Sequence, residues 1–127
     1  MSINRRTVLA GTAGLALAGA ATAAKAATVK VTVDAVNSKW VPSMVAIKAG
    51  DRVEWTNTAP IPHQVCFKKE RSRMPEKILV PAGATEFESP QLKRGEKFTY
   101  KFTTKGEYHY SCRLHENMSM FGVVVVS

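Results

Sequence analysis

A short segment near the C-terminus contains side chains that bind soft metal ions. It runs from Cys112 to Met120 and reads CRLHENMSM, so one thiol, one imidazole and two thioethers lie within nine residues. A second imidazole, His63, lies far upstream in a strand-like segment. Two imidazole nitrogens and a thiolate in one plane, with a weak thioether on the axis, form the ligand set of a blue-copper electron-transfer site. The residue types therefore predict a mononuclear, type 1 copper centre.

Each ligand type suits a centre that carries single electrons. The thiolate of Cys112 would form a strong, covalent copper–sulfur bond. The imidazoles of His63 and His115 bind both Cu(I) and Cu(II), and a distant thioether avoids the square-planar geometry that Cu(II) otherwise favours. Little rearrangement is then needed between oxidation states, which favours fast electron transfer.

The axial methionine has two candidates. The spacing Cys-x2-His-x2-Met selects Met118, whereas Cys-x2-His-x4-Met selects Met120. Ligand chemistry alone leaves this choice open.

Most of the chain after residue 26 alternates apolar and polar residues, as half-buried strands do. The segments that predict strands are 28–33, 44–48, 52–57, 63–67, 95–102, 107–112 and 121–126, with shorter strands at 77–80 and 85–88 inside an irregular stretch, 68–90. Seven to nine short strands separated by turns, with no convincing helix, predict an all-β, antiparallel sandwich. Cys112 would end one strand, and the loop after it would fold back around the metal before the last strand begins.

Alternation also predicts which side chains form the core. Phe98, Tyr100 and Phe102 share one face of their strand, and Tyr108, Tyr110 and Cys112 share one face of the next, which leaves His109 on the opposite face as a structural residue. Met44 and Met74 are expected to fill the core.

The first 26 residues resemble an export signal. Arg5 and Arg6 precede an apolar, Ala- and Leu-rich run that ends in Ala24-Lys25-Ala26, a small-x-small cleavage pattern. The arginine pair favours twin-arginine export over an ordinary secretory signal. The run is too short and too rich in Ala and Gly for a stable membrane span, so we expect no integral membrane protein. Residues 27–127 are then one domain that works in the periplasm.

The charge balance suggests the kind of partner. Loss of Arg5, Arg6 and Lys25 with the signal reduces the formal net charge from +8 to +5. A moderately basic monomer is expected to meet redox proteins with an acidic docking surface, through Arg113 in the ligand segment or the basic run 68–73. Nucleic acid is an improbable partner, because no basic stripe is interleaved with stacking aromatic residues.

Two cysteines in an exported protein would ordinarily suggest a disulfide. Cys66 lies three residues beyond His63, about 10 Å along an extended strand. If His63 and Cys112 bind one metal ion, Cys66 is poorly placed to reach Cys112. We therefore expect Cys66 to be a small apolar residue or a free thiol.

The predicted strands and the candidate ligand residues resemble those of the cupredoxins, in particular plastocyanin, pseudoazurin and amicyanin. The similarity covers nearly all of residues 27–127, including KAGDRVEWTN at 48–57, PHQVCF at 62–67 and GEYHYSC at 106–112. It implies a Greek-key sandwich, a copper cofactor and electron transfer. The family continues Met-x-Gly-x-Val-x-Val after its axial methionine, and Met120 fits this frame, so the resemblance favours Met120 as the axial ligand beside His63, Cys112 and His115.

Two positions depart from the family pattern. Gln64 follows the first histidine where the family often has Asn, which steadies the cysteine loop, and Leu114 stands where Pro usually precedes the second histidine. The geometry around the ligands, and with it the reduction potential, depends on such neighbours.

The residues fit other copper functions less well than an electron carrier. Copper delivery or resistance is the main alternative, although such proteins favour exchangeable sites without a buried thiolate. A copper oxidase or nitrite reductase needs a second copper centre, and the chain has three histidines in all. Zinc would fit a Cys-His-His set, but a long thioether contact would contribute little to its binding. We therefore predict an electron carrier and not an enzyme.

Overall fold

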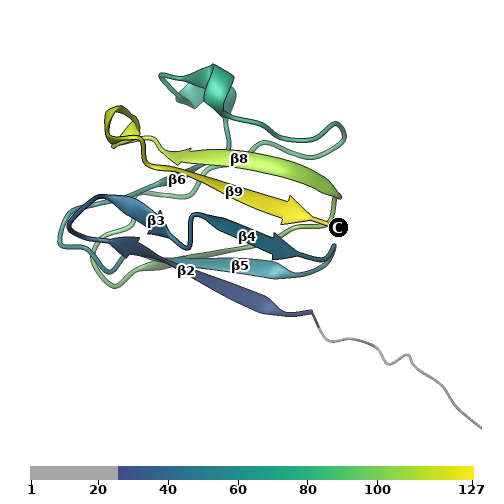
Figure 1. Ribbon diagram of the computed structural model, residues 1–127, viewed down its shortest axis with the longest axis horizontal. Coiled ribbons are helices and arrows are strands. Elements are labelled where there is room, and N and C mark those ends of the chain that lie inside the picture. The colour runs from purple at the N-terminus through teal and green to yellow at the C-terminus, as the bar shows by residue number, and fades with distance from the viewer. Residues whose placement is uncertain (1–25) are drawn as a thin grey trace, which may run out of the picture.

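The computed structural model describes residues 26–127, which form a sandwich of two four-stranded sheets (Figure 1). The strands are β2 (Thr28–Asp34), β3 (Lys39–Val41), β4 (Met44–Ile47), β5 (Arg52–Thr56), β6 (Val65–Cys66), β7 (Lys97–Lys101), β8 (Gly106–Cys112) and β9 (Phe121–Val126). Three single-turn 3-10 helices lie in the connections: η2 (Lys69–Arg71), η3 (Pro75–Lys77) and η4 (Glu116–Met118). The predicted all-β sandwich is confirmed.

The two sheets combine antiparallel and parallel pairs. One has the order β3-β2-β5-β7 and the other β4-β9-β8-β6. The pairs β2·β5 and β4·β9 are parallel, whereas the remaining pairs are antiparallel. A parallel pair needs a crossover connection, and the chain between β2 and β5 supplies one by placing β4 in the opposite sheet. The sheets are therefore mixed rather than purely antiparallel.

Aromatic side chains fill the space between the sheets. Trp55 of β5 and Tyr110 of β8 are both buried, and the Trp55 Nε1–H donates to the Tyr110 hydroxyl over 3.1 Å. Phe67 stacks on Tyr110 with ring centroids 4.8 Å apart, and Phe102 lies edge-on to Phe67. Tyr108, Tyr110 and Cys112 are all buried, as their alternation along β8 predicts. This core joins the two sheets directly below the ligand segment.

The irregular stretch is where the sequence prediction was least accurate. In place of a strand at 77–80, η3 covers Pro75–Lys77, and Leu79 forms a single bridge with His109. In place of a strand at 85–88, Glu88 forms one bridge with Cys66. Prolines at 75, 81 and 90 remove backbone donors and limit each pairing to one bridge. The strand β3 was not predicted, because three residues are too few to show an alternating pattern.

One core assignment was wrong. Met44 lies on β4 with 61% of its surface exposed, since the inward positions of that strand are taken by Val45 and Ile47. Among the described residues, no helix is long and apolar enough to cross a membrane.

Gly122 of β9 tests how tightly the sandwich is packed. It pairs with Tyr110, and a Cβ added at this glycine would lie 2.4 Å from Cζ of the Tyr110 ring. The ring is held between Trp55 and Phe67 and has little room to move. We expect Gly122→Ala to lower the free energy of unfolding of the metal-free protein by about 1–3 kcal/mol, as overpacking does. Urea unfolding measures this.

Ala46→Val is the matched control, because it adds volume at an exposed position of the neighbouring strand β4. Equal stability of Gly122→Ala and the parent protein would show that the core is looser than described.

Candidate metal centre

Cys112 and His115 reach the site from one connection. Cys112 is the last residue of β8, and its backbone N–H donates to the carbonyl of Met120 over 2.9 Å, which closes the connection into a loop. The His115 N–H donates to the Cys112 carbonyl over 2.9 Å, which turns the histidine back toward the cysteine. We call residues 113–119 the ligand loop.

His63 lies at the end of the connection that crosses from β5 in one sheet to β6 beside β8 in the other. The buried Asn57 shapes this connection: its side-chain amide donates to the carbonyls of Ile61 over 2.8 Å and Leu92 over 2.7 Å, and its Oδ1 accepts the Ala59 N–H. His63 also exchanges two backbone hydrogen bonds with Leu92. The histidine is therefore held in place before β6 begins.

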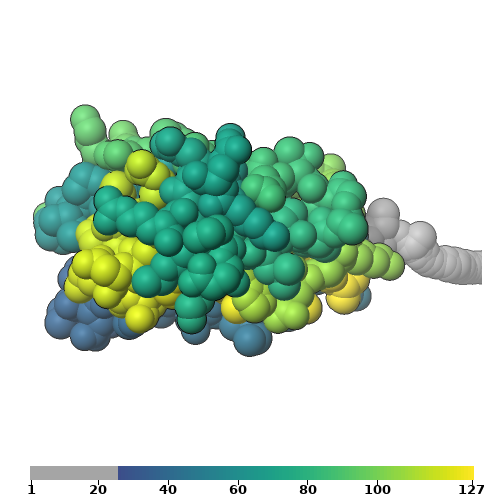
Figure 2. All heavy atoms as spheres, turned by 90° about the horizontal axis from the view of Figure 1, so that it is seen from above, coloured from purple at the N-terminus to yellow at the C-terminus, as the bar shows by residue number. Residues whose placement is uncertain are grey.

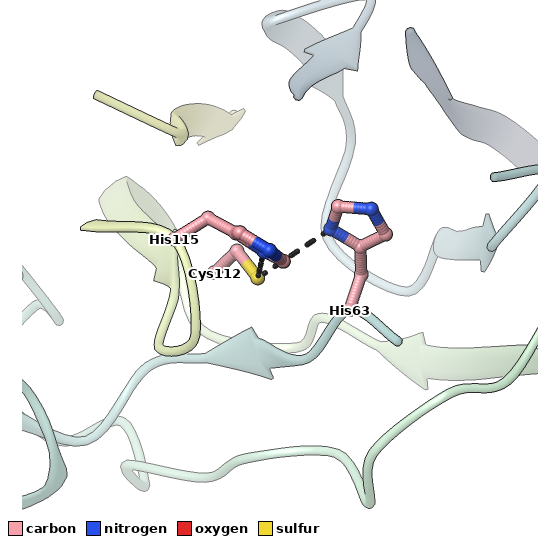
Figure 3. Close-up of side chains that lie close together, drawn as sticks. All are labelled: His63, Cys112 and His115. Atoms are coloured by element: carbon pink, nitrogen blue, oxygen red, sulfur yellow. Dashed lines mark hydrogen bonds between the residues drawn. The ribbon is translucent and has the colours of Figure 1, made fainter. Parts of the chain in front are cut away.

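These three side chains converge at one end of the sandwich (Figure 3). The Sγ of Cys112 lies 3.7 Å from Nδ1 of His63 and 3.3 Å from Nδ1 of His115. The three potential ligand atoms all lie within 4.8 Å of one another. Three predicted site residues are thus brought together, with both Nδ1 atoms directed at the sulfur.

Burial sets the protonation states of the group. It lowers the pKa of His63 to about 4, and the neighbouring His115 adds to the effect. Burial also lowers the pKa of His115. Burial raises the pKa of the Cys112 thiol, against the backbone N–H groups of the loop that lower it. At neutral pH the group holds two neutral imidazoles and a protonated thiol.

The two methionines differ in their surroundings. Met120 has 0% of its surface exposed and belongs to the core cluster that includes Cys112 and Trp40. Met118 is 47% exposed on the outside of η4. The structure thus places Met120, and not Met118, in the interior beside Cys112.

Gln64 links the segment of His63 to Cys112 of β8. Its backbone N–H points at the Cys112 sulfur over 3.4 Å. Its side-chain amide donates to the Ser89 carbonyl over 2.7 Å and to Glu88 over 3.2 Å, so it anchors the segment before Leu92. Leu114, the other departure from the family pattern, packs half-buried against the core.

The ligand loop is held from two sides. Lys39 of β3 donates through Nζ to the carbonyls of Met118 over 3.1 Å and Ser119 over 3.3 Å, where η4 ends in a left-handed residue. On the other side, the buried carboxylate of Glu116 accepts hydrogen bonds from Ser72, Arg73 and Ser111. Neither support was predicted from the sequence.

Two residues that the prediction set aside lie outside the group. Cys66 is buried and unpaired, and its Sγ lies 3.5 Å from the Lys68 carbonyl; the described cysteines form no disulfide. His109 is half-exposed on the outer face of β8, where its Nε2 lies 2.9 Å from Glu107.

Four supporting residues were not predicted from the sequence: Lys39, Asn57, Ser89 and Glu116. Ser89 is buried, accepts the Val65 N–H through Oγ over 2.9 Å and donates to the Pro90 carbonyl. The partners of these residues lie up to 80 positions away in the chain, so local patterns do not reveal them. The one available signal was Glu116 itself, an acidic residue directly after a predicted ligand.

The donor set fits copper. A thiolate and two imidazoles in a buried setting, with a buried thioether nearby in the chain, are the ligands that copper electron-transfer sites use. A hard cation such as Mg²⁺ or Ca²⁺ would require oxygen ligands in place of this group.

Comparison with known proteins also indicates a copper-binding protein. Residues 27–127 match the family described as copper binding proteins, plastocyanin/azurin family. A chloroplastic plastocyanin from Tetradesmus obliquus is 40% identical over 124 residues, which cover 93% of this chain and 80% of that protein. Amicyanin-alpha from Methylorubrum extorquens is 38% identical over 82 residues, 65% of this chain and 59% of that protein.

Solved structures agree in fold. A purple cupredoxin from Nitrosopumilus maritimus superimposes with a TM-score of 0.60 at 25% identity, covering 78% of this chain and 99% of that one. An oxidised amicyanin variant gives a TM-score of 0.61 at 27% identity, covering 78% of this chain and 81% of that one. A copper nitrite reductase from Thermus scotoductus matches 79% of this chain but only 22% of its own length, at 25% identity and a TM-score of 0.60.

The protonation states lead to a prediction about metal uptake. Near pH 7.5 the imidazoles are neutral and the thiol is protonated, so binding of Cu(II) as a thiolate complex should release about one proton. Affinity should fall as the pH decreases below 7.5, because the thiol must lose its proton to bind, and it should fall more steeply near pH 4, where His63 also takes up a proton. A pH-indicator titration in weak buffer counts the protons released.

Cys112→Ser is the control and should release none. Release of two or more protons from the parent protein at pH 7.5 would contradict the assigned protonation states.

Proposed function

Because this chain belongs to the plastocyanin/azurin family of copper-binding proteins, we propose that His63, Cys112, His115 and Met120 hold its single type 1 copper ion. The protein is a copper electron carrier and not an enzyme, as its plastocyanin and amicyanin relatives are carriers. The convergence of the Cys112 sulfur and the two Nδ1 atoms at the end of the sandwich is the observation that supports this ligand set.

The protein supplies ligands whose positions need to change little between the two oxidation states of copper. His63 and Cys112 are both fully buried; Cys112 pairs with Val65 of β6, and His63 precedes that strand by two residues. Copper, when bound, supplies the one-electron redox step. A site whose ligands are positioned in advance keeps the geometry similar in both oxidation states.

His115 is the ligand that lies nearest to solvent. It is half-exposed, whereas His63 and Cys112 are buried, and its ring centroid lies 4.6 Å from that of His63. We expect electrons to enter and leave through this imidazole edge, since it is the ligand that a partner can approach.

A copper-delivery role is the alternative. Delivery favours exchangeable ligands at the surface, and here the proposed thiolate is buried with a backbone N–H directed at its sulfur. These contacts favour retained copper and the carrier function.

Visible spectroscopy tests the ligand set. Addition of Cu(II) to the parent protein should give an intense band near 600 nm from the copper–thiolate bond. Cys112→Ser should lose this band. Met120→Leu should retain it but raise the midpoint potential, because a weak donor to Cu(II) is removed.

Met118→Leu is the matched control, with the same change on the exposed face of η4. It should leave band and potential unchanged. A colourless copper complex of the parent protein, or a potential that moves with Met118 and not with Met120, would contradict the assignment.

The site of action is part of the proposal. Residues 1–26 lie mostly outside the described residues, and their sequence supports twin-arginine export with cleavage after Ala26. The domain 27–127 would then carry electrons in the periplasm, as a monomer. Two relatives aligned over most of this chain are named as chloroplastic plastocyanins.

An electron carrier exchanges electrons with redox partners, and the charge around the ligand loop suggests their chemistry. Arg113 lies in that loop, and its Nε donates to the Arg71 carbonyl over 3.1 Å, which places the basic segment 68–73 beside the loop. Lys69, Arg71 and Arg73 are exposed there. We propose that partners present an acidic surface to this region.

Electron exchange with ferricyanide, a small anionic oxidant, tests this charge effect. The second-order rate constant for oxidation of the copper-loaded, reduced protein should fall as ionic strength rises. Arg73→Gln/Arg113→Gln should flatten this dependence, because positive charge beside the site is lost. Stopped-flow absorbance measures the rates.

Lys101→Gln/Lys105→Gln removes the same charge at the far ends of β7 and β8 and should retain the salt dependence. Equal flattening by both pairs would mean that only net charge matters and would contradict a local docking region.

A further inference from the structure

Glu116 is a buried acidic residue inside the ligand loop. It directly follows His115, begins η4 and is 3% exposed. Burying a carboxylate is costly unless hydrogen bonds replace its water. A buried carboxylate directly beside a proposed metal ligand therefore indicates a structural or functional role.

Three donors surround the carboxylate. The hydroxyls of Ser72 and Ser111 both approach Oε2, at 2.5 Å and 2.6 Å, and the backbone N–H of Arg73 donates to Oε1 over 2.8 Å. The Ser72 Oγ accepts the Met74 N–H over 2.9 Å, so its own proton is available for Glu116. Hydroxyl contacts this short are typical of an ionised acceptor. The geometry is that of a carboxylate that accepts from all three donors.

These bonds join two segments that are distant in sequence. Ser72 and Arg73 lie between η2 and η3, whereas Ser111 lies on β8 directly before Cys112. Viewed from above, the teal segment that contains η2 and η3 lies beside the yellow ligand loop (Figure 2). The bond from Arg113 to the Arg71 carbonyl adds a second link between the same segments.

We propose that Glu116 is the positioning residue of the ligand loop, a buried anion that fastens this loop to the segment 69–77 and lowers the midpoint potential of the bound copper. The inference rests on the proposed ligand set, since it assigns Glu116 a role toward that ion. The side chain of Gln64 does not hold the ligand loop, because it is hydrogen-bonded to Ser89 and Glu88.

The two effects have separate physical causes. The hydrogen bonds restrict the loop and hence the His115 ring, whether or not metal is present. A negative charge buried near the ion stabilises Cu(II) relative to Cu(I), because Coulomb interactions are weakly screened away from water. The first effect predicts a change in the metal-free protein, and the second a change in potential.

Four variants separate these effects. Glu116→Ala removes both the hydrogen bonds and the charge. Glu116→Gln removes the charge and keeps the shape, but it replaces one accepting oxygen by an NH2 group and so keeps only part of the hydrogen bonds. Ser72→Ala leaves the loop sequence intact and removes two hydrogen bonds, the one to Glu116 and the one that the Ser72 Oγ accepts from the Met74 N–H within its own segment. Glu70→Gln is the matched control, because it removes the same charge from an exposed position of η2 in the same segment.

Backbone hydrogen exchange of the metal-free proteins tests the positioning role. Glu116→Ala and Ser72→Ala should both speed backbone exchange in residues 113–119 and in 69–74 together, with the smaller effect for Ser72→Ala. Glu70→Gln should leave both segments protected as in the parent. If Glu116→Ala does not fold, hydrogen exchange of Ser72→Ala alone tests the positioning role. Unchanged exchange in residues 113–119 for Ser72→Ala would then overturn the positioning role, because residues 69–74 also lose the bond between the Met74 N–H and the Ser72 Oγ.

Midpoint potentials of the copper-loaded proteins measure the effect of the Glu116 charge. Glu116→Gln should raise the potential, while Glu70→Gln should leave it near that of the parent. An unchanged or lowered potential in Glu116→Gln, or equal shifts in both variants, would overturn this part. Failure of the ligand set itself is distinguishable, because the parent protein would then lack the blue band before any variant is compared.

Discussion

The pairing of β6 with β8 is the constraint on which the metal centre depends. It sets Val65 opposite Cys112 and directs the Gln64 N–H at the Cys112 sulfur. His63 precedes this pair by two residues, so the same register that closes the sheet also brings its ring to the sulfur. A change of register by one residue would turn Cys112 away from the interior. Sheet closure and site assembly are therefore one event.

The rest of the fold supports that register. Trp55, Phe67 and Tyr110 form an aromatic core below the site, and Gly122 leaves the space that Tyr110 needs. Above it, the ligand loop is held by Lys39 on one side and Glu116 on the other. A loop fastened at both ends and anchored on a packed core can present the half-exposed His115 without losing its position. This arrangement suits a carrier that must change oxidation state with little movement.

The sequence predicted the sandwich from period-two alternation and the pair Cys112 and His115 from their close spacing, because both are local patterns. His63 lies far from them in the chain, and its place at the site was predicted from the resemblance of residues 62–67 to the family. The prediction of Met120 rested on the residues that follow it, and the structure places its side chain in the interior. The Glu116 contacts could not be predicted, because their partners at Ser72 and Arg73 depend on how an irregular, proline-containing segment folds back. The missing strands at 77–80 and 85–88 have a different cause: the prolines at 75, 81 and 90 are visible in the sequence, and they limit the pairing of Leu79 with His109 and of Glu88 with Cys66 to single bridges.

The central claim is that one thiolate and two imidazoles bind copper in a geometry that the fold sets in advance. Copper K-edge X-ray absorption of the loaded protein in both oxidation states tests it most directly. We expect one short copper–sulfur bond and two copper–nitrogen bonds, with the same number of ligands in Cu(II) and Cu(I). A spectrum without a short sulfur contact, or a set of ligands that changes on reduction, would contradict the account.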